Sequence, residues 1–271
     1  MDWNELLTGW VSPASQSSEL QQQIWDRVAV DYGQREIPTF ENDAFLQHIS
    51  ECAQLEKSMR VLDIGCGAGR YSLALAPHVK EAVGVDISPN MIEYAQNRVV
   101  KLEMGNISFK TLDWNSVNID DEDYTSAFDL VFAHTTPAIG DIEALDKMNR
   151  CSRQFCFYEK PTRRTSSLSD AVFNEIGLVN KEVDSDIIYI FAYLWNKGYQ
   201  PKFWYRKAGW ESKRSIDDAA AWCINRAKLL RMLSADEESK IRACIESAAV
   251  DGIVHEVTET TLVTIAWRVD E

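Results

Sequence analysis

The sequence lacks any long apolar run, since no segment approaches the roughly 18 consecutive apolar residues that a membrane-spanning helix requires. It also begins without the pattern of a secretory signal peptide, and it contains no C-x-x-C pair. These absences predict a cytoplasmic protein with no membrane span, no metal site and no disulfide framework. The cysteines are then expected to be buried free thiols, and they are Cys52, Cys66, Cys151, Cys156, Cys223 and Cys244.

Basic residues are also scarce. The chain has 28 lysines and arginines against 42 aspartates and glutamates, which gives a net charge of −14. Proteins that bind nucleic acids draw much of their affinity from basic side chains that neutralise phosphates, so this charge argues against DNA or large RNA as a substrate. A local basic cluster at residues 160–164 (KPTRR) is compatible with a solvated loop or with an anion-binding patch.

The overall composition is ordinary for a globular enzyme. Of the 271 residues, 45% are hydrophobic and 26% are charged, which is enough to bury a sizeable core. This size predicts one enzyme-sized domain that carries an elaboration. We expect an arm with covering helices over residues 1–57, a ligand-binding core over 58–165, and the rest of the sheet with a helical lid over 166–271.

Short apolar runs alternate with amphipathic segments between residues 60 and 160. Nearly all-apolar strands that alternate with helices are typical of a parallel sheet covered by helices on both faces. The predicted strands are 61–64, 81–86, 107–112, 128–133 and 153–159, with helices up to about 77 and over 88–101 and 142–151. Before them, one helix is expected from a cap at Ser17 or Ser18 to about Tyr32, and another over about 41–57.

The C-terminal part follows a different pattern. The predicted helices are 169–176, 186–197, 216–230 and 235–249, with a strand near 202–206. Residues 253–258 and 261–269 alternate apolar and polar side chains across a short break, which predicts a β-hairpin.

The most informative segment is VLDIGCGAGR at residues 61–70, in which a buried strand leads into three alternating glycines and then a helix. Glycines let the chain turn sharply and approach a ligand closely, and a helix start offers N–H groups that suit a carboxylate. A dinucleotide fingerprint would have glycine or alanine where Arg70 stands, which argues against NAD or FAD. The alternative is that these glycines serve only a tight turn.

Two aspartates follow at the ends of the next strands. Asp86 ends the second strand, where a carboxylate accepts hydrogen bonds from both hydroxyls of a ribose. Its alternative role is to cap the next helix, for which Ser88 is better placed. Asp113 precedes Trp114 and suits an adenine amino group, with Ile87 covering the base, or else it is an ordinary exposed aspartate at a strand end.

Four segments together resemble the ordered motifs of class I S-adenosylmethionine-dependent methyltransferases. They are DIGCGAG at the first strand, VGVDIS at the second, LDW at the third and FDLVFAH at the fourth. The resemblance covers about residues 20–160 and is closest to the small-molecule branch, similar to the ubiquinone and menaquinone biosynthesis type. It implies a Rossmann-like α/β fold whose seven-stranded, mostly parallel sheet has an antiparallel last strand and helices on both faces.

The resemblance also implies which residues bind S-adenosylmethionine. Asp63 and the glycine turn are expected to face its methionine part, Asp86 its ribose, and Asp113 with Trp114 its adenine. The expected binding residues are Tyr32, Asp63, Gly65, Cys66, Gly67, Gly69, Asp86, Ile87, Met91, Asp113, Trp114 and Ala133.

The helix that precedes the motifs carries Trp25, Arg27 and Tyr32. It resembles the aromatic segment that such methyltransferases fold over the cofactor. Trp25 and Tyr32 share one face of the helix, so the same pattern equally describes a helix that packs its apolar stripe on a core.

The acceptor side is expected where the fourth strand ends, at His134-Thr135-Thr136-Pro137. Holding an acceptor against the methyl carbon contributes up to roughly 7–11 kcal/mol, so an obligatory catalytic residue is not required. The Asn/Asp-Pro-Pro-aromatic pattern of many amino-methylating enzymes is missing, which argues against methylation of a base amine. His134 is a candidate general base, or else a histidine hydrogen-bonded at the strand end.

Further candidates for the acceptor pocket are Tyr158 and Glu159 and the aromatic residues of the C-terminal part. As a lid, these rings would attract an apolar, planar or cationic acceptor; the alternatives are a second small core or a homodimer surface. The rings are those of Phe191, Tyr193, Trp195, Tyr199, Phe203, Trp204, Tyr205, Trp210 and Trp222.

The sequence therefore favours a methyltransferase that uses S-adenosylmethionine, releases S-adenosylhomocysteine and methylates a small-molecule acceptor. Two alternatives stay open. A tRNA or protein methyltransferase would need a basic or extended docking surface, and a non-catalytic module would bind the cofactor without turnover.

Overall fold

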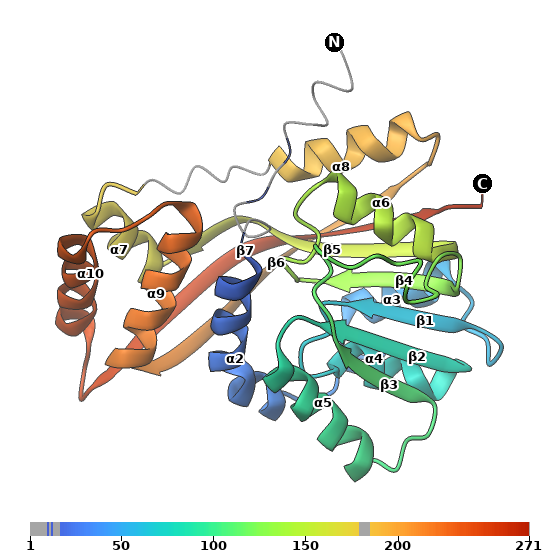
Figure 1. The fold of residues 1–271 in the computed structure, drawn as a ribbon, viewed down its shortest axis with the longest axis horizontal. Coiled ribbons are helices and arrows are strands. Elements are labelled where there is room, and N and C mark those ends of the chain that lie inside the picture. Colours follow the sequence, from blue (N-terminus) through green and yellow to red (C-terminus); the bar gives the residue numbers. More distant parts are fainter. Residues whose placement is uncertain (1–9, 11, 13–16, 179–184, 271) are drawn as a thin grey trace. The chain divides into compact units, whose positions relative to one another are not determined.

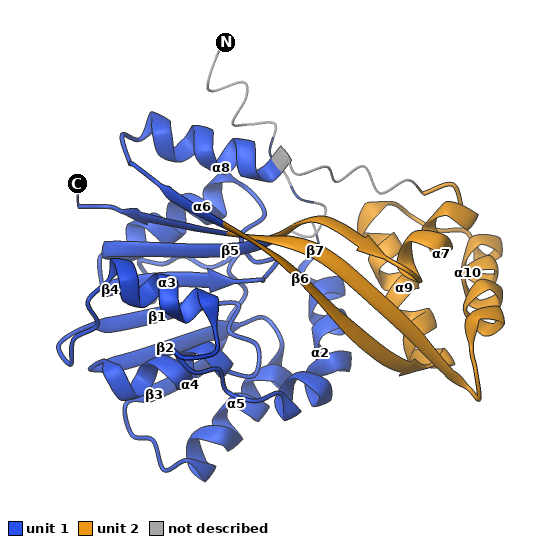
Figure 2. Ribbon diagram, turned by 180° about the vertical axis from the view of Figure 1, so that it is seen from behind, with its two compact units in different colours: residues 1–160, 186–204, 264–271 blue, residues 161–185, 205–263 orange. Residues whose placement is uncertain are grey.

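The computed structural model describes residues 10, 12, 17–178 and 185–270, so most of the arm expected at residues 1–17 lies outside the described residues. The chain divides into two compact units (Figure 2). Unit 1 comprises residues 1–160, 186–204 and 264–271, and unit 2 comprises residues 161–185 and 205–263. Three of the four boundaries between the units fall within long strands, so each of these strands contributes a portion to both units, and the fourth falls at the start of a helix.

One seven-stranded sheet organises the chain (Figure 1). Its strands are β1 Arg60–Ile64, β2 Glu81–Asp86, β3 Ile107–Thr111, β4 Phe128–His134, β5 Ser152–Ser166, β6 Lys202–Ser215 and β7 Ile253–Arg268. Their order is β3-β2-β1-β4-β5-β7-β6, and the pairs β3-β2, β2-β1, β1-β4 and β4-β5 are all parallel.

The last strand, β7, runs against its neighbour β5. At one end the Val269 amide donates to the Gln154 carbonyl, and at the other the Ser167 amide donates to the Val257 carbonyl. Higher numbers in one strand thus face lower numbers in the other, which is the antiparallel pattern. The expected mostly parallel sheet with an antiparallel last strand is confirmed.

The helices of unit 1 mostly begin at a residue whose side chain caps the first turn. Ser17, Asp43, Ser88 and Asp141 each accept a hydrogen bond from an amide three residues later, which satisfies an otherwise free N–H group. The helices are α2 Ser18–Gln34, α3 Ala44–Cys52, α4 Arg70–Leu75 with the 3-10 turn η2 Ala76–His78, α5 Pro89–Lys101, α6 Ile142–Cys151 and α8 Ser185–Asn196.

The main core of unit 1 forms where α3 and α4 pack on the sheet. Phe45, Leu46 and Ile49 of α3 are fully buried there against Phe132 of β4 and Phe157 of β5. Burying such a side chain contributes about 1.5–3 kcal/mol. The central strands are apolar because their side chains are covered, as the burial of residues 61–64 illustrates.

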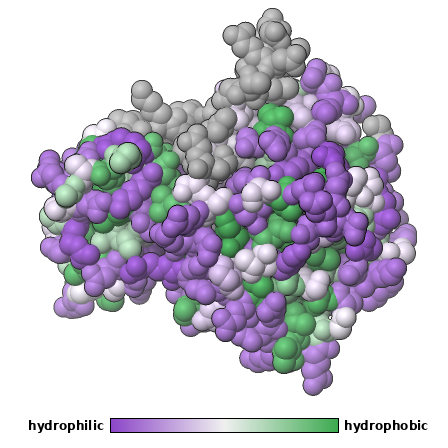
Figure 3. All heavy atoms as spheres, in the orientation of Figure 1, coloured by the Kyte–Doolittle hydropathy of each residue, from purple (hydrophilic) through white to green (hydrophobic). Residues whose placement is uncertain are grey.

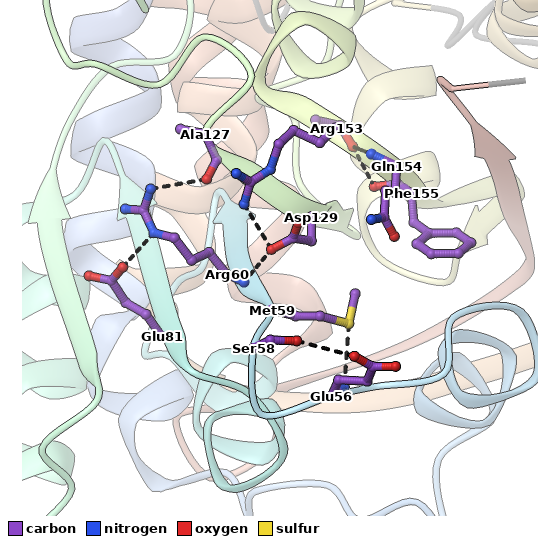
Figure 4. A network of polar contacts seen from close by, with 11 residues as sticks. Glu56, Ser58, Met59, Arg60, Glu81, Ala127, Asp129, Arg153, Gln154 and Phe155 are labelled. Atoms are coloured by element: carbon purple, nitrogen blue, oxygen red, sulfur yellow. Dashed lines mark hydrogen bonds and ion pairs between the residues drawn. The ribbon is translucent and has the colours of Figure 1, made fainter.

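The starting ends of the central strands are joined by a polar network around Arg60 (Figure 4). The Arg60 guanidinium donates to Glu81 (2.6 Å) and to the Ala127 carbonyl (3.0 Å), and its backbone amide donates to Asp129 (2.7 Å). Arg153 adds an ion pair of 3.0 Å to Asp129. These contacts join β1, β2, β4 and β5 at the end opposite the one where ligands bind in such sheets.

Residues 253–268 form one continuous strand, so the predicted hairpin is wrong. Alternate residues are exposed up to Glu259. Residues 260–267 are all buried, and the last residue, Arg268, is exposed. The break in the sequence pattern marks this change of burial. No glycine, asparagine or proline is present there to support a two-residue turn, whereas the β-branched Thr260 and Thr261 suit a strand.

β5 and β6 are both longer than predicted, and β5 includes the whole basic cluster at residues 160–164. The interpretation of this cluster as a solvated loop is therefore wrong. Lys160 forms an ion pair with Asp186, and the Arg164 guanidinium lies 5.3 Å from the centroid of the Trp210 ring. Two of its cations thus already have partners within the protein.

Unit 2 has a core of its own, formed by α7 (Ser169–Glu175), α9 (Ile216–Leu230) and α10 (Ala235–Ala248). Next to this core, Glu256 of β7 is buried, accepts a hydrogen bond from Ser169 (2.5 Å) and pairs with Arg214 (2.7 Å). A buried carboxylate is stable only with partners of this kind.

The six cysteines are free thiols, but only Cys151, Cys156 and Cys223 are buried, so the expectation that all six are buried is wrong. Within the described ranges, no helix combines the length and the apolar character needed to span a bilayer. On the face drawn in Figure 3, hydrophilic residues cover most of the described surface and the hydrophobic ones form smaller groups.

Candidate functional site

The glycine segment turns sharply between β1 and α4. The amides of Gly65 and Cys66 both donate to the Val85 carbonyl, at 2.8 and 3.0 Å, so the turn is fixed to the end of β2. Gly65, Gly67 and Gly69 have φ angles of 69°, 52° and 77°. Residues with a side chain rarely adopt these left-handed conformations, which explains the alternating glycines.

The three glycines differ in their surroundings. A side chain at Gly65 would meet Thr136 Oγ1 at 2.0 Å, and one at Gly69 would meet the Phe109 ring at 2.5 Å. At Gly67 the nearest atom would be Met91 Sδ at 3.9 Å. The fold therefore requires glycine at positions 65 and 69, whereas a methyl group at Gly67 would make only one ordinary van der Waals contact.

Asp86 lies at the end of β2, and its carboxylate is tied to the glycine turn. One oxygen accepts the Gly67 amide (2.8 Å) and the other accepts the Ser88 amide (2.9 Å). Burial raises the pKa of Asp86 to about 6, although the hydrogen bonds from Ser88 and Gly67 counteract the shift. The Ser88 side chain caps α5, as predicted, so Asp86 does not serve as the cap of this helix.

Asp63 of β1 is buried beside the same turn, where it accepts a hydrogen bond of 2.5 Å from the Ser72 hydroxyl of α4. Burial raises the pKa of Asp63 to about 7; the Ser72 hydrogen bond lowers it, and the charge of Asp86 raises it further. Asp63 and Asp86 both resist ionisation, and a nearby positive charge would ease it. The glycine turn beside them therefore favours a positively charged ligand.

Asp113 follows β3 and is half-buried. Its carboxylate accepts hydrogen bonds from the Asn115 amide (3.0 Å) and the Ser116 hydroxyl (3.0 Å), which fold the next turn around it. It also accepts the Ser18 hydroxyl of α2 at 2.6 Å. Asp63, Asp86 and Asp113 thus stand at or just beyond the carboxyl ends of three adjacent strands. We call these three residues, with the glycine turn 65–69, the strand-end site.

Trp114 is buried, and its indole N–H donates to the Ala144 carbonyl of α6 at 3.1 Å. Lys147 of the same helix donates to the carbonyls of Trp114 (2.5 Å) and Asn115 (2.9 Å). Burial lowers the pKa of Lys147. The side chain of Trp114 therefore packs on α6, and its assignment to adenine stays a prediction.

Helix α2 covers part of the strand-end site. Its Asp26 accepts a hydrogen bond of 2.5 Å from Ser88 at the start of α5, and its Ala29 is buried in a cluster with Ala68 and Met91. Trp25 and Tyr32 join the edge of the same cluster. The helix therefore packs a stripe on the core beside the glycine turn, and the interpretation that it folds over a cofactor stays a prediction.

The aromatic rings of α2 also contact each other. Trp25 and Tyr32 lie edge to face, with centroids 5.8 Å apart and an angle of 86° between the planes. Both side chains are half-buried. Arg27, which belongs to the same sequence pattern, is exposed.

His134 ends β4 and pairs in register with Glu159 of β5. Its Nε2 lies 3.1 Å from Glu159 Oε1, and its Nδ1 lies 3.1 Å from the Thr135 hydroxyl. Glu159 is fully buried, and its other oxygen accepts the Thr264 hydroxyl at 2.5 Å. A buried carboxylate and an imidazole thus face each other at the end of the sheet.

The remaining predicted residues surround the glycine turn or lie in the sheet. Ile87 is half-buried directly after Asp86, Met91 is buried in the first turn of α5, and Ala133 is buried in β4. Burial strongly raises the pKa of the Cys66 thiol. Tyr158 is buried, and its hydroxyl donates to the Ile139 carbonyl at 3.1 Å, so it supports the sheet end.

Several contacts around these residues were not predicted from the sequence. Ser72 comes from a segment that carries no motif, and Thr136 comes from the predicted acceptor segment, but the contacts of these residues with Asp63 and Gly65 depend on the fold. Ser18 and Asp26 lie on a helix that the sequence predicted, but their partners are distant along the chain. Among the residues with a described placement, no group of three or more potential ligands could hold a metal ion.

Comparisons with known proteins identify similarity to methyltransferases. A family model described as "Methyltransferase domain" matches residues 55–194. Magnesium-protoporphyrin O-methyltransferase of Rhodobacter capsulatus is 35% identical over 83 residues, which make up 31% of this chain and 37% of that protein. tRNA (uracil-5-)-methyltransferase homolog A of Mus musculus is 41% identical over 61 residues, which make up 22% of this chain and 10% of that protein. The matches span well under half the length of these relatives.

Among solved structures, the cyclase SpnF superposes with a TM-score of 0.51 at 16% identity, over 94% of this chain and 98% of that chain. At this identity the likeness concerns the fold alone. It extends the shared architecture beyond the segment that the family model matches.

Proposed function

The chain belongs to the methyltransferase domain family, and from this premise we propose that it transfers the methyl group of S-adenosylmethionine to a small-molecule acceptor. The observation that supports the proposal most is the strand-end site. A side chain at Gly67 would overlap no atom of the protein, and two acids with raised pKa values, Asp63 and Asp86, lie at the same turn.

The residues of this site suit each part of the cofactor. Asp86 would accept the ribose hydroxyls, the backbone at Gly67 would lie against the methionine part, and Asp113 would accept from the adenine amino group. When bound, S-adenosylmethionine supplies an electrophilic methyl group on a cationic sulfonium. The charge of that sulfonium favours a site with buried acids, because it compensates the cost of ionising them.

The acceptor side is proposed at residues 134–136, next to the glycine turn. Thr136 is so close to Gly65 that no side chain fits between them, so this loop and the methionine part of the cofactor would be neighbours. Orienting an acceptor in such a place contributes up to roughly 7–11 kcal/mol to the barrier reduction. His134 is the group there that could take up a proton.

A macromolecular acceptor is the second candidate, because one of the relatives is a tRNA methyltransferase. The net charge of −14 opposes it, and two cations of the basic cluster at 160–164 already pair within the protein. A third candidate is a protein that keeps the fold without transferring methyl groups. One structural neighbour is a cyclase, and the same fold can support different reactions.

The proposal is tested by mass spectrometry with methyl-deuterated S-adenosylmethionine. The purified protein is incubated with this cofactor and either a small-molecule extract or bulk tRNA. We expect S-adenosylhomocysteine and a labelled small molecule, both reduced in Asp86→Ala and unchanged in Asp121→Ala, an exposed control. Labelled tRNA would support the second candidate, and cofactor binding without any labelled product would support the third.

A further inference from the structure

Unit 1 contains a cavity of about 280 Å³ that belongs to no function described so far. It is lined by the end of α3, by residues in the first half of β5, by the segment that leads into β6, and by residues 266–268 of β7. None of these residues belongs to the strand-end site, which lies at the carboxyl ends of β1, β2 and β3. The volume is close to the lower limit for small-molecule sites, which is about 300 Å³.

Small residues beside large ones leave this space open. Phe155 and Phe157 are alternate residues of β5, so they lie on the same face of the sheet, and Ala266 of the neighbouring β7 packs in the same cluster. Ala266 adds only a methyl group there. Helix α3 covers this face as far as its last residue, Cys52, after which the chain becomes extended. Gly198, which has no side chain, also lines the cavity.

The buried part of the lining is apolar and largely aromatic. Phe157, Ala266 and Trp267 are all almost completely buried, and Phe155 is half-buried. The indole N–H of Trp267 donates to Asn149 Oδ1 at 2.7 Å, so this donor is already used within the protein. Flat rings of this kind favour a planar apolar ligand, both by the hydrophobic effect and by ring–ring contact.

The charged residues of the lining are both basic, Lys202 and Arg268. The Arg268 guanidinium pairs with Asp270 at 2.8 Å and lies 5.1 Å from the centroid of the Phe155 ring. Lys202 is exposed, and no carboxylate of the described chain forms an ion pair with it. In a chain with 42 acidic and 28 basic residues, a described lining with two cations and no carboxylate is a local exception. Its charge is complementary to an anionic group.

We propose that this cavity is a second ligand site, which binds a small planar aromatic molecule that carries an anionic group. The ring system packs on Phe155 and Phe157, and the anionic group lies at the rim near Lys202 and Arg268. The inference goes beyond the proposed methyl transfer and does not depend on it. The small volume suits one or two fused rings, which distinguishes this occupant from the flat surface of a partner protein.

The ligand class is tested with two fluorescent probes, anilinonaphthalenesulfonate and the neutral phenylnaphthylamine, which has the same rings without the sulfonate. Each is titrated into the full chain with excess S-adenosylhomocysteine. We expect the sulfonate probe to bind one site, more tightly than the neutral probe. Lys202→Gln should weaken binding of the sulfonate probe about three- to fivefold and leave the neutral probe unchanged. Lys207→Gln, which changes an exposed lysine of unit 2, is the matched control and should affect neither probe.

The position of the probe is tested by alkylation with iodoacetamide, measured for each cysteine by mass spectrometry. Cys52 lines the cavity, Cys244 lies in α10 of unit 2, and both are half-buried. At a sulfonate-probe concentration of about ten times its Kd, alkylation of Cys52 should slow about tenfold, and that of Cys244 should not change. Cys52→Phe should fill the cavity and weaken binding of this probe at least about tenfold, whereas Cys244→Phe, the matched control, should not.

Four outcomes would overturn the proposal. Equal affinity of the wild type and Lys202→Gln for the sulfonate probe would remove the anionic group from the ligand class. Unchanged alkylation of Cys52 beside bound probe, or displacement of the probe by S-adenosylhomocysteine, would place the probe elsewhere. Alkylation of Cys52 that slows as the protein concentration rises, without probe, would show that a second copy of the chain covers the cavity. The wild-type measurements decide the matter even if Cys52→Phe fails to fold.

Discussion

Gly65 and Gly67 lie two positions apart in one turn, but substitution should affect folding at the first and cofactor binding at the second. Gly65→Ala should destabilise the protein, because the new methyl group would overlap Thr136. Gly67→Ala should fold, at a cost of about 1–2 kcal/mol for its left-handed backbone, yet bind S-adenosylhomocysteine at least about tenfold more weakly. Thermal unfolding and calorimetry measure the two effects. Full cofactor affinity in Gly67→Ala would show that the cofactor does not lie against Gly67.

Asp63 illustrates how a residue proposed to bind a ligand lowers the stability of its own fold. Its pKa is about 7 in the folded protein, above the ordinary value of 3.8, so the folded state holds its proton more tightly than the unfolded state. The stability that depends on this proton is present at low pH and is lost as the pH rises from about 4 to about 7.

Asp63→Asn should therefore raise the free energy of unfolding, and more so at pH 8 than at pH 5. The difference between the two pH values should be on the order of 2 kcal/mol. Urea unfolding at both values measures it, with Asp121→Asn as an exposed control. A gain that is the same at both pH values, or larger at pH 5, would contradict the burial argument for Asp63.

The elements between residues 60 and 151 were predictable from sequence because glycine, aspartate and serine mark their ends. β2 and α6 have the predicted bounds, and β1, β3 and β4 differ by one residue. The candidate site was predictable for the same reason, since Asp63, Asp86 and Asp113 occupy the ends of these strands. Their contacts with Ser72 and Ser18 were not, because such contacts depend on packing between distant segments.

The long strands β5, β6 and β7 were the elements that sequence patterns described least well. Their outer portions carry charged and polar side chains at exposed positions, as the alternating burial of β6 shows. Such portions lose the apolar signal that identifies buried strands. Polar residues therefore suggested a loop at 160–164 and a break near Glu259, where the backbone pairing of the sheet in fact continues.

Helix α2 is the element whose behaviour should respond most to the cofactor. It is held over the strand-end site by the contacts of Ser18 with Asp113 and of Asp26 with Ser88. Addition of S-adenosylhomocysteine should slow amide hydrogen exchange across residues 18–34, because the ligand would add contacts beneath the helix. Exchange in α10, residues 235–248, serves as the control. Equal protection of both helices, or of neither, would argue against the covering role.

At the scale of the whole molecule, charge separates the candidate acceptors. A protein with a net charge of −14 should not bind bulk tRNA even at low salt, and any dissociation constant should be weaker than about 10⁻⁴ M. Fluorescence anisotropy with labelled tRNA measures this, with salt varied. Tight binding that weakens steeply with salt would indicate phosphate contacts and favour a macromolecular acceptor.

The central claim is that the ends of β1, β2 and β3 hold the adenosyl part of S-adenosylmethionine, with Asp86 on the ribose. The most direct test is calorimetric titration of S-adenosylhomocysteine into the wild type, Asp86→Ala and the exposed control Asp121→Ala, with thermal unfolding to confirm that each variant is folded. Asp86→Ala should bind about 1.5–3 kcal/mol more weakly, which is about 10- to 150-fold, because a charged group loses its hydrogen bonds to the ribose. An unchanged affinity in a folded Asp86→Ala protein would contradict the claim.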